Sequence, residues 1–179
     1  MGSGGWMFER WHDFYILVGS AAGALIGLMF VVVTLTSNMD RDQALRGASR
    51  YMTPTVTQFT AVMLIAALSA APLDPAWQRG ALALLGAILA AWSLFNVWRM
   101  FSTSPGVHAT HWTDPWFYAV APAAAYLALI AVAWAGSALG VGAEALAVLV
   151  LGIRNAWDLI TWIAPQGGAR AGPATPPQE

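Results

Sequence analysis

The sequence predicts an all-α integral membrane protein, built as a polytopic transmembrane helical bundle of about five spans. Of its 179 residues, 58% are hydrophobic and only 9% are charged, whereas soluble domains usually carry about 25% charged residues. The apolar residues also form runs long enough to cross a bilayer core of roughly 30 Å at about 1.5 Å per helical residue. We therefore expect the lipid bilayer to cover most of the outer surface.

Charge and composition exclude several classes of function. The formal net charge is −1 and the pI is about 6.3, so the chain lacks the basic field that binds nucleic acid through its phosphates. Cysteine is absent, which excludes thiolate metal sites, disulfides and a cysteine nucleophile. Lysine is absent as well, so no Schiff base can form. Because no nucleophile elbow, phosphate-binding loop or dinucleotide fingerprint occurs, we predict no cofactor and no enzymatic activity.

The first predicted span covers residues 14–36, a run without a charged residue. A cleaved signal peptide would have a shorter apolar core behind a positively charged start, so we expect this helix to be retained, with residues 1–13 as an external segment. A polar loop follows at 38–50. Thr53 can then cap a second helix, opened by the proline that follows it, which runs to about residue 71.

Two Asp-Pro pairs, at 74–75 and 114–115, mark the starts of the next helices. The aspartate carboxylate can accept hydrogen bonds from the unpaired N–H groups of a first turn, and proline needs no donor at the first helical position. The third span is expected at 76–101. The fourth is expected to run to about Trp134, with a kink at Pro122 because proline removes a helical hydrogen bond.

The fifth predicted span, 139–163, contains four interrupting polar residues: Glu144, Arg154, Asn155 and Asp158. Two interpretations are open, a membrane-spanning helix and an amphipathic helix lying in the interface, and the second would leave four spans. We expect the helical bundle to occupy residues 14–163. The Gly- and Pro-rich tail at 164–179 is expected to be disordered, because it cannot bury enough apolar area to fold.

The arginines fall unevenly about the predicted spans. Arg10 and Arg79 lie on one side of the membrane, and five lie on the other: Arg41, Arg46, Arg50, Arg99 and Arg170. Because cytoplasmic loops carry the excess of positive residues, we predict an N-terminus outside and a C-terminus in the cytoplasm. A composition rich in Ala, Gly and Arg but without lysine indicates a bacterial genome of high GC content, and hence a multi-pass protein of the bacterial inner (plasma) membrane.

Gly19, Gly23 and Gly27 recur at every fourth residue of the first span, the spacing of a glycine zipper. They leave one helix face as nearly bare backbone, which another helix can approach closely. In lipid, where no hydrophobic effect pulls helices together, such a face provides van der Waals contact and weak Cα–H···O bonds. Its partner is either a helix of the same bundle or a helix of another membrane protein, including a second copy in a homo-oligomer.

Counting along the predicted spans places polar residues from several helices in one layer, near the cytoplasmic third of the bilayer. Its members are Gln58, Asn96, Arg99, Arg154, Asn155 and Asp158, with Thr34 and Thr57 at the same level. Arg154 and Asp158 can pair on one helical face, or Arg99 can meet the fifth helix across the bundle. Intramembrane ionisable groups often mark a functional cavity or ion path, whereas arginines near an interface can also reach water along their own stems.

Two further sets of residues are weaker candidates. Arg79 and Glu144 fall at similar depth near the outer end and can form a second, structural pair. His108, His111 and Asp114 are of types that ligate zinc. The turn-forming residues between the predicted helices argue against a helix that presents both imidazoles, so we predict solvated loop histidines and no metal site.

The first span opens on a distinctive set of residues: Trp11-His12-Asp13-Phe14-Tyr15, then Gly19, Ala22, Gly27, Leu28, Met29 and Phe30. In this segment the chain resembles a group of uncharacterised bacterial small integral membrane proteins, some of which are labelled as modulators of the FtsH protease. The resemblance covers the first span only. It implies a helical protein of the bacterial inner membrane.

The favoured function is that of a non-enzymatic scaffold or modulator, which acts through helix packing with protein partners. The alternative is a small channel or transporter subunit, in which the polar layer lines a pathway. A water-filled cavity joining the polar residues would favour the alternative, whereas dry and locally paired side chains would count against it. A membrane enzyme is the least favoured class, because His12 is predicted to lie on the opposite side of the membrane from His108 and His111.

Overall fold

The computed structural model describes residues 8, 10–36, 53–102 and 116–168 of the chain. Within these ranges, the side chains of residues 33, 35, 36, 99–101 and 162–168 are not described. Arg99 therefore belongs to a described helix, but its side chain lies outside the described part of the structure. The predicted loop histidines, His108 and His111, lie outside the described residues altogether.

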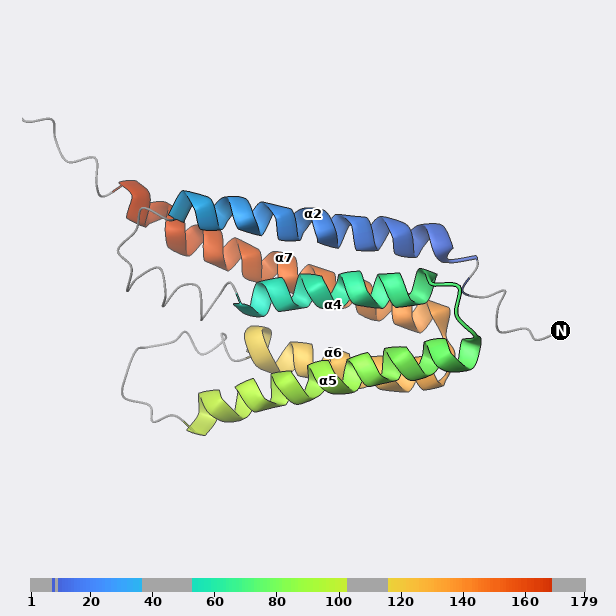
Figure 1. Ribbon diagram of the computed structural model, residues 1–179. Helices are drawn as coiled ribbons and strands as arrows, with labels where there is room; N and C mark the ends of the chain where they lie inside the picture. The colour runs from blue at the N-terminus through green and yellow to red at the C-terminus, as the bar shows by residue number, and fades with distance from the viewer. Residues whose placement is uncertain (1–7, 9, 37–52, 103–115, 169–179) are drawn as a thin grey trace, which may run out of the picture.

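The described residues form long helices and one π-helical turn, with no strand among them (Figure 1). The elements are α2 (His12–Thr36), α4 (Thr53–Ala70), α5 (Pro75–Ser102), the π-helical turn η2 (Trp116–Val120), α6 (Ala121–Trp134) and α7 (Ala138–Gly168). Five stretches of 18 to 24 residues are long and apolar enough to cross a membrane, one of them formed by η2 and α6 together. The prediction of an all-α bundle with about five spans is confirmed.

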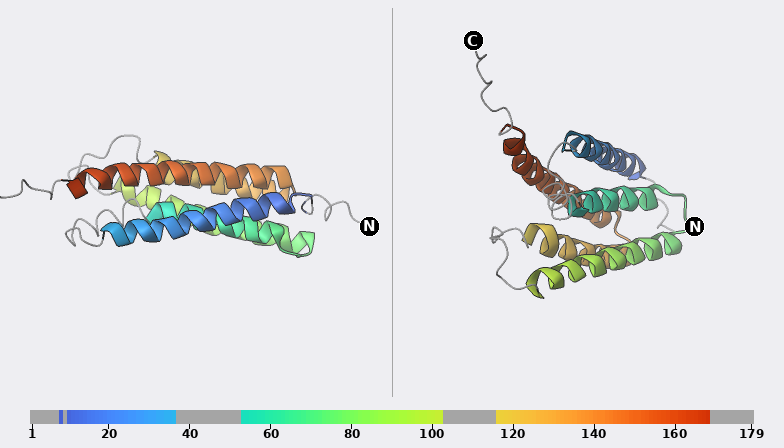
Figure 2. Two further views of the ribbon diagram at one scale, coloured as in Figure 1. Left: turned by 90° about the horizontal axis from the view of Figure 1, so that it is seen from above. Right: turned by 60° about the vertical axis from the view of Figure 1, so that its left-hand side comes forward.

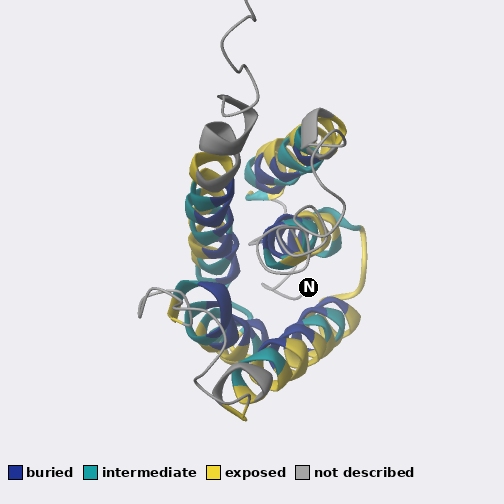
Figure 3. Cartoon of the chain, turned by 90° about the vertical axis from the view of Figure 1, so that its left-hand side faces the viewer, coloured by how far each residue is buried: buried dark blue, intermediate teal, exposed yellow. Residues whose placement is uncertain are grey.

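The helices run back and forth between two ends of the bundle (Figures 1 and 2). The Asp74 end holds the start of α2 and the turns that join α4 to α5 and α6 to α7. The Thr53 end holds the start of α4, η2, and the ends of α2, α5 and α7. Figure 3, viewed from the Thr53 end, shows α4 on the inner side of an arc made by α2, α7, α6 and α5, and α4 contacts α2, α5 and α7.

The turn between α4 and α5 follows the predicted Asp-Pro signal. Pro75 is the first residue of α5, and the Asp74 carbonyl accepts the N–H of Gln78 at 2.9 Å. The Gln78 side chain reaches back across the turn, where its Nε2 donates to the carbonyl oxygens of Leu68 and Ser69 at 3.0 and 2.9 Å. Since the last carbonyls of a helix have no partner within it, Gln78 satisfies two groups at the end of α4.

The turn between α6 and α7 depends on a glycine in the left-handed conformation. Gly136 has a φ of 66°, a value that costs other residues about 1–2 kcal/mol. The N–H of Ser137 donates to the carbonyl oxygen of Val132 at 3.1 Å, which closes the end of α6. The Ser137 hydroxyl then accepts the N–H of Gly140 at 3.0 Å and so caps the start of α7.

A kink was predicted at Pro122. The structure places this proline in the first turn of α6, directly after the π-helical turn η2. Proline has no N–H, so Pro122 cannot donate to the carbonyl oxygen four residues earlier, at Tyr118. The π-helical turn η2 is wider than an α-helical turn, and it accommodates the absence of this hydrogen bond. This turn places Phe117 and the buried Tyr118 at the Thr53 end of the bundle and leaves Trp116 exposed.

The core is apolar along most of the bundle. The largest fully buried side chains include Tyr15, Phe59, Ile65, Leu82, Leu129 and Val148. Large apolar residues also cover the outside, for example Leu17, Phe30, Leu84, Trp92 and Val150. A soluble monomer rarely exposes so much contiguous apolar surface, so lipid is the medium that fits this exterior.

The fifth helix is the one element whose end differs from the expectation. α7 packs along α4 and α6, and its stretch Ala138–Thr161 is long and apolar enough to span, which favours a span over an interfacial helix. The helix continues to Gly168, five residues past the predicted end at 163 and through Pro165, so the start of the expected disordered tail is helical. Residues 169–179 lie outside the described chain.

Candidate functional site

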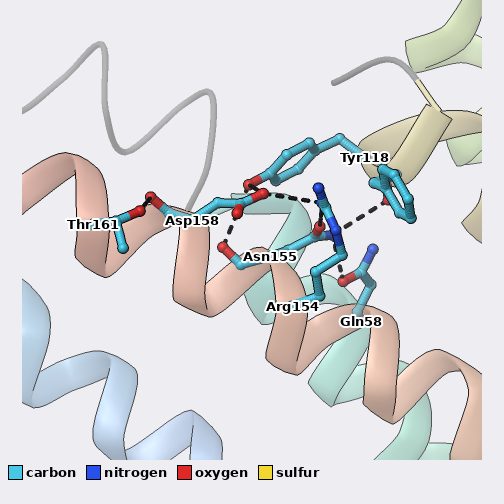
Figure 4. Close-up of polar contacts among 7 residues, drawn as sticks. Gln58, Tyr118, Arg154, Asn155, Asp158 and Thr161 are labelled. Carbon is cyan, nitrogen blue, oxygen red and sulfur yellow. Dashed lines mark hydrogen bonds and ion pairs between the residues drawn. The ribbon is translucent and has the colours of Figure 1, made fainter. Parts of the chain in front are cut away.

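Polar side chains gather inside the bundle at the Thr53 end, where α4, η2 and α7 meet (Figure 4). We call Gln58, Tyr118, Arg154, Asn155 and Asp158 the polar cluster. Four of these residues belong to the layer predicted from depth along the helices. The structure brings those four together, and it adds Tyr118, which sequence reasoning missed.

Asn155 is the centre of the polar cluster. Its side chain is fully buried, with 0% exposure. The Nδ2 atom donates to Gln58 Oε1 at 3.0 Å and to the carbonyl oxygen of Phe117 at 3.3 Å. One amide therefore ties α7 both to α4 and to η2. Because a buried polar group without a partner costs about 1–3 kcal/mol, these bonds help to fix how the three elements are placed.

Helix periodicity explains why Asn155 points inward. The buried positions of α7 recur every three or four residues: Val141, Ala145, Val148, Gly152, Asn155 and Leu159. Such a stripe faces the core of a bundle. Asn155 is the polar member of an otherwise apolar stripe, so its amide must find partners within the protein.

Two of the three aromatic residues of η2, Phe117 and Tyr118, close the polar cluster on its other side. The Tyr118 hydroxyl lies 3.3 Å from the carbonyl oxygen of Asn155 and 3.3 Å from Asp158 Oδ2, and it can donate to either. The Arg154 guanidinium lies over the ring of Phe117. The distance from Arg154 Cζ to the ring centroid is 3.6 Å. This cation–π contact holds the arginine against η2.

Arg154 and Asp158 form the local pair that was one of the two predicted alternatives. Arg154 NH1 lies 3.0 Å from Asp158 Oδ2, and the two side chains are 37% and 34% exposed. The pair therefore lies at the border between the protein interior and its surroundings. The second alternative, a contact with Arg99 across the bundle, concerns a side chain outside the described residues.

A pocket with a volume of about 70 Å³ lies beside the polar cluster, between α4, α5 and the η2–α6 segment. Its lining combines apolar surface with the hydroxyl and amide groups of Thr57, Gln58, Ser93, Asn96, Tyr118 and Tyr126. Asn96, a predicted member of the layer, thus lies at the pocket, where its Nδ2 donates to the carbonyl oxygen of Trp92 at 3.0 Å. Ser93 and Tyr126 were not singled out from the sequence, because one hydroxyl in an apolar run gives no signal of a cavity.

The predicted outer pair is not formed. Within the described chain no ion pair joins Arg79 to Glu144, and Arg79 Nε donates instead to the carbonyl oxygen of Pro75 at 3.2 Å. An arginine one turn into α5 finds this carbonyl on its own helix, so depth alone did not identify its partner. The described residues also contain no group of three or more His, Asp or Glu side chains that could hold a metal ion.

The glycines of α2 have different surroundings. A Cβ built on Gly19 would lie 3.0 Å from the Cβ of Ala66 on α4, so this glycine allows the two helices to approach closely. A Cβ on Gly23 or Gly27 would meet no described atom within 4 Å. The predicted glycine face is therefore used inside the bundle at one position of the three.

The site as a whole offers neutral donors and acceptors around a small pocket, beside a partly exposed ion pair. Such an arrangement can hold helices in register and can bind a small polar molecule. Comparisons of the chain with protein-family models, with curated proteins and with solved structures give no match. The function is therefore argued from the fold and from these contacts.

Proposed function

We propose that the protein is a non-enzymatic membrane scaffold or modulator, and that α2 pairs with a second copy of the chain. The observation that carries the proposal is the open space beside Gly23 and Gly27, where a Cβ would meet no described atom within 4 Å. These two glycines have no packing role inside the described protomer. A partner helix would give them one.

Glycines in the other helices support this argument, because several of them serve close packing inside the bundle. A Cβ built on Gly86, Gly142 or Gly152 would lie 3.0, 3.0 and 2.7 Å from the nearest atom of another helix. A glycine in a helix interior costs about 1 kcal/mol relative to alanine. Gly80 of α5 also lacks such contacts but stands alone, whereas Gly23 and Gly27 lie about one turn apart on one helix, and this pair favours a contact outside the protomer.

The rotation of about 100° per residue explains why the three α2 glycines face different directions. At about 100° per residue, positions four apart are separated by about 40° around the axis. With Gly19 directed at α4, Gly23 and Gly27 are turned away from it by about 40° and 80°. Together with the exposed Ser20, Gly23 and Gly27 form what we call the α2 strip.

A second copy of the chain fits the α2 strip best. The strip is small and uncharged, and a two-fold axis would place the same strip of both copies face to face. Small residues on both sides let the backbones approach closely, which drives helix association in lipid. The resemblance of the first span to proteins labelled as modulators of the FtsH protease supports a role exerted on another membrane protein by surfaces that the dimer leaves free.

The mass of the intact complex in a mild detergent or in nanodiscs tests the proposal. We expect a dimer for the native chain and a monomer for Gly23→Ile and Gly27→Ile, because an isoleucine side chain would keep the two backbones apart. Ala21→Ile is the matched control, since Ala21 is exposed on the same helix but lies about 100–160° around the axis from the residues of the α2 strip. A monomeric native chain, or glycine variants that remain dimeric, would refute the pairing.

The polar pocket favours a second candidate function, a small channel or transporter subunit. The pocket and the polar cluster lie at the Thr53 end, whereas buried apolar side chains such as Tyr15, Leu82 and Leu129 fill the core further along. A pathway would therefore have to form between copies in an oligomer. Solute or ion flux into liposomes by a complex of three or more copies would favour this function over the scaffold.

For the orientation, we propose that the Thr53 end faces the cytoplasm of a bacterial cell. The support is the arginine count, because four of the eight arginines lie in the segments beyond this end and Arg99 lies near it, whereas only Arg10 and Arg79 lie at the other end. A reporter active only in the cytoplasm should be inactive at the N-terminus and active at the C-terminus. The opposite pattern would reverse the orientation and leave the bundle itself unchanged.

A further inference from the structure

The pocket at the Thr53 end contains two buried polar atoms that no described residue satisfies. Gln58 is 2% exposed and Tyr126 is 1% exposed, and both line the pocket. Gln58 Nε2 and the Tyr126 hydroxyl have no hydrogen-bond partner among the described residues. Because buried polar groups in proteins are nearly always hydrogen-bonded, the two atoms indicate a binding site.

The contact between Gln58 and Asn155 determines what the pocket offers to a ligand. Gln58 Oε1 accepts the hydrogen bond from Asn155 Nδ2 at 3.0 Å (Figure 4). This contact directs the oxygen of the amide to α7 and leaves the Nε2 donor for the pocket. A ligand must therefore present an acceptor to Gln58, whereas the Tyr126 hydroxyl can either donate or accept.

The lining of the pocket selects an uncharged ligand. Among the described residues, its polar lining groups are hydroxyls and amides, and none of them is a charged side chain. An ion placed there without a counter-charge would suffer a large loss of hydration energy. The volume of about 70 Å³ exceeds the roughly 10–15 Å³ that one water molecule requires, so the pocket has room for water or for one small neutral solute.

Depth in the membrane indicates the aqueous phase as the source of the ligand. Gln58 lies five residues from the start of α4 and Tyr126 ten residues from the start of η2, which correspond to about 8 and 15 Å along the helices. Tyr126 is thus near the middle of a hydrocarbon core roughly 30 Å thick. Lipid headgroups and ester groups lie outside this core, whereas a molecule from water can enter at the Thr53 end.

We propose that the pocket binds a small uncharged molecule from the aqueous phase, which accepts a hydrogen bond from Gln58 Nε2 and bonds to the Tyr126 hydroxyl. The molecule is water or a neutral solute of similar size. This binding site is independent of the α2 strip, which lies on a different helix and faces outward. The pairing of two copies and the occupancy of the pocket can therefore fail separately.

Nuclear magnetic resonance on the full chain in nanodiscs, with isotope-labelled glutamine side chains, tests the proposal. Gln78 is the matched control, since it is 4% exposed but its Nε2 already donates to two carbonyl oxygens. We expect magnetisation transfer from water to the Gln58 amide and none to the Gln78 amide. The Gln58→Met variant assigns the signal, and Ser93→Leu, which fills the pocket, should abolish the transfer to Gln58.

Acetamide, a small neutral molecule with one acceptor oxygen, distinguishes the two candidate ligands, water and a neutral solute. If acetamide replaces water as the origin of the transfer to Gln58, the pocket is a solute site. If the transfer from water is unchanged at high acetamide concentration, it is a water site. Both results support the proposal, and the absence of transfer to Gln58 from either molecule overturns it.

Thermal unfolding of two tyrosine variants provides a second test. The Tyr15 hydroxyl donates to the carbonyl oxygen of Ala138 at 2.7 Å, so Tyr15→Phe shows what the loss of one buried hydrogen bond does to Tm. We expect Tyr126→Phe to lower Tm by a similar amount, roughly 2–4 °C for a chain of this size. An increase in Tm on Tyr126→Phe would mean that the hydroxyl is buried without any partner, and it would refute the proposal.

Discussion

Replacing Asn155 with leucine should destabilise the bundle by about 1–3 kcal/mol. The change removes the hydrogen bonds to Gln58 Oε1 and to the Phe117 carbonyl oxygen. Hydrogen bonds between side chains inside membranes contribute about 0.6 kcal/mol on average and about 1.7 kcal/mol at most, and two such bonds give the stated range. Since about 1.4 kcal/mol is a factor of ten, the folding equilibrium constant should fall by about fivefold to about 150-fold.

A double-mutant cycle isolates the contact between Gln58 and Asn155 from changes in shape. Gln58→Met and Asn155→Leu are measured alone and together, by equilibrium unfolding in mixed micelles followed through tryptophan fluorescence, for which the chain has ten tryptophans. Replacing both partners by apolar groups leaves neither side chain of this contact with a stranded donor or acceptor, and the loss of the bond to the Phe117 carbonyl oxygen is common to both variants that carry Asn155→Leu. We therefore expect the double variant to be less destabilised than the sum of the single variants, with a coupling energy of about 0.6–1.7 kcal/mol.

Thr161→Val is the control for this cycle. Thr161 is exposed on the same helix, and its hydroxyl donates at 3.0 Å to the carbonyl oxygen of Asp158, on its own helix. Its replacement should change stability by less than about 0.5 kcal/mol. A coupling energy of zero, or an Asn155→Leu variant as stable as Thr161→Val, would refute the view that Asn155 joins three elements.

Four further substitutions test the packing and the turns, each by the same unfolding measurement. Gly152→Ala should cost about 1–3 kcal/mol, because its Cβ would lie 2.7 Å from the Phe59 ring, whereas Gly80→Ala meets no described atom and should stabilise by up to about 1 kcal/mol. Gln78→Met should cost about 1–3 kcal/mol, since it strands two carbonyl oxygens at the end of α4. Gly136→Ala should cost about 1–2 kcal/mol at its φ of 66°.

The helices could be predicted from the sequence because a bilayer restricts their length and because their starts carry local signals. Thr53 is the first residue of α4, and α5 begins at the proline of the Asp-Pro pair at 74–75, so both predicted starts agree with the structure within one residue. The end of α7 could not be predicted in this way. Pro165 is a stop signal in the sequence, yet α7 continues past it to Gly168, since one missing hydrogen bond in a long helix does not oblige it to end.

The depth of the polar residues could also be predicted, but not which of them meet. Counting residues along a span gives the level of a side chain, and this count placed Gln58 and Asn155 at the same level. The direction of a side chain around the helix axis depends on how the helices pack. For that reason the predicted partner of Arg79 was wrong. Tyr118 was missed because an aromatic residue near a helix end resembles an interfacial anchor.

The glycine pattern shows the same limit. A four-residue spacing turns by about 40° at each step, so Gly27 is turned by about 80° from Gly19 and the spacing alone does not decide whether the three glycines face one neighbour. The sequence left two partners open, a helix of the bundle and a helix of another chain. The structure assigns the first to Gly19 and leaves Gly23 and Gly27 open.

The burial of polar residues from separate helices, away from lipid, is the central claim, and footprinting with a carbene reagent dissolved in the bilayer tests it most directly. Trp157 and Ile153 of α7 are 66% and 48% exposed, whereas Asn155 and Leu159 are 0% exposed. The native chain should therefore be labelled at Trp157 and Ile153 and spared at Asn155 and Leu159. Labelling of Asn155 as heavy as that of Trp157 would contradict the claim.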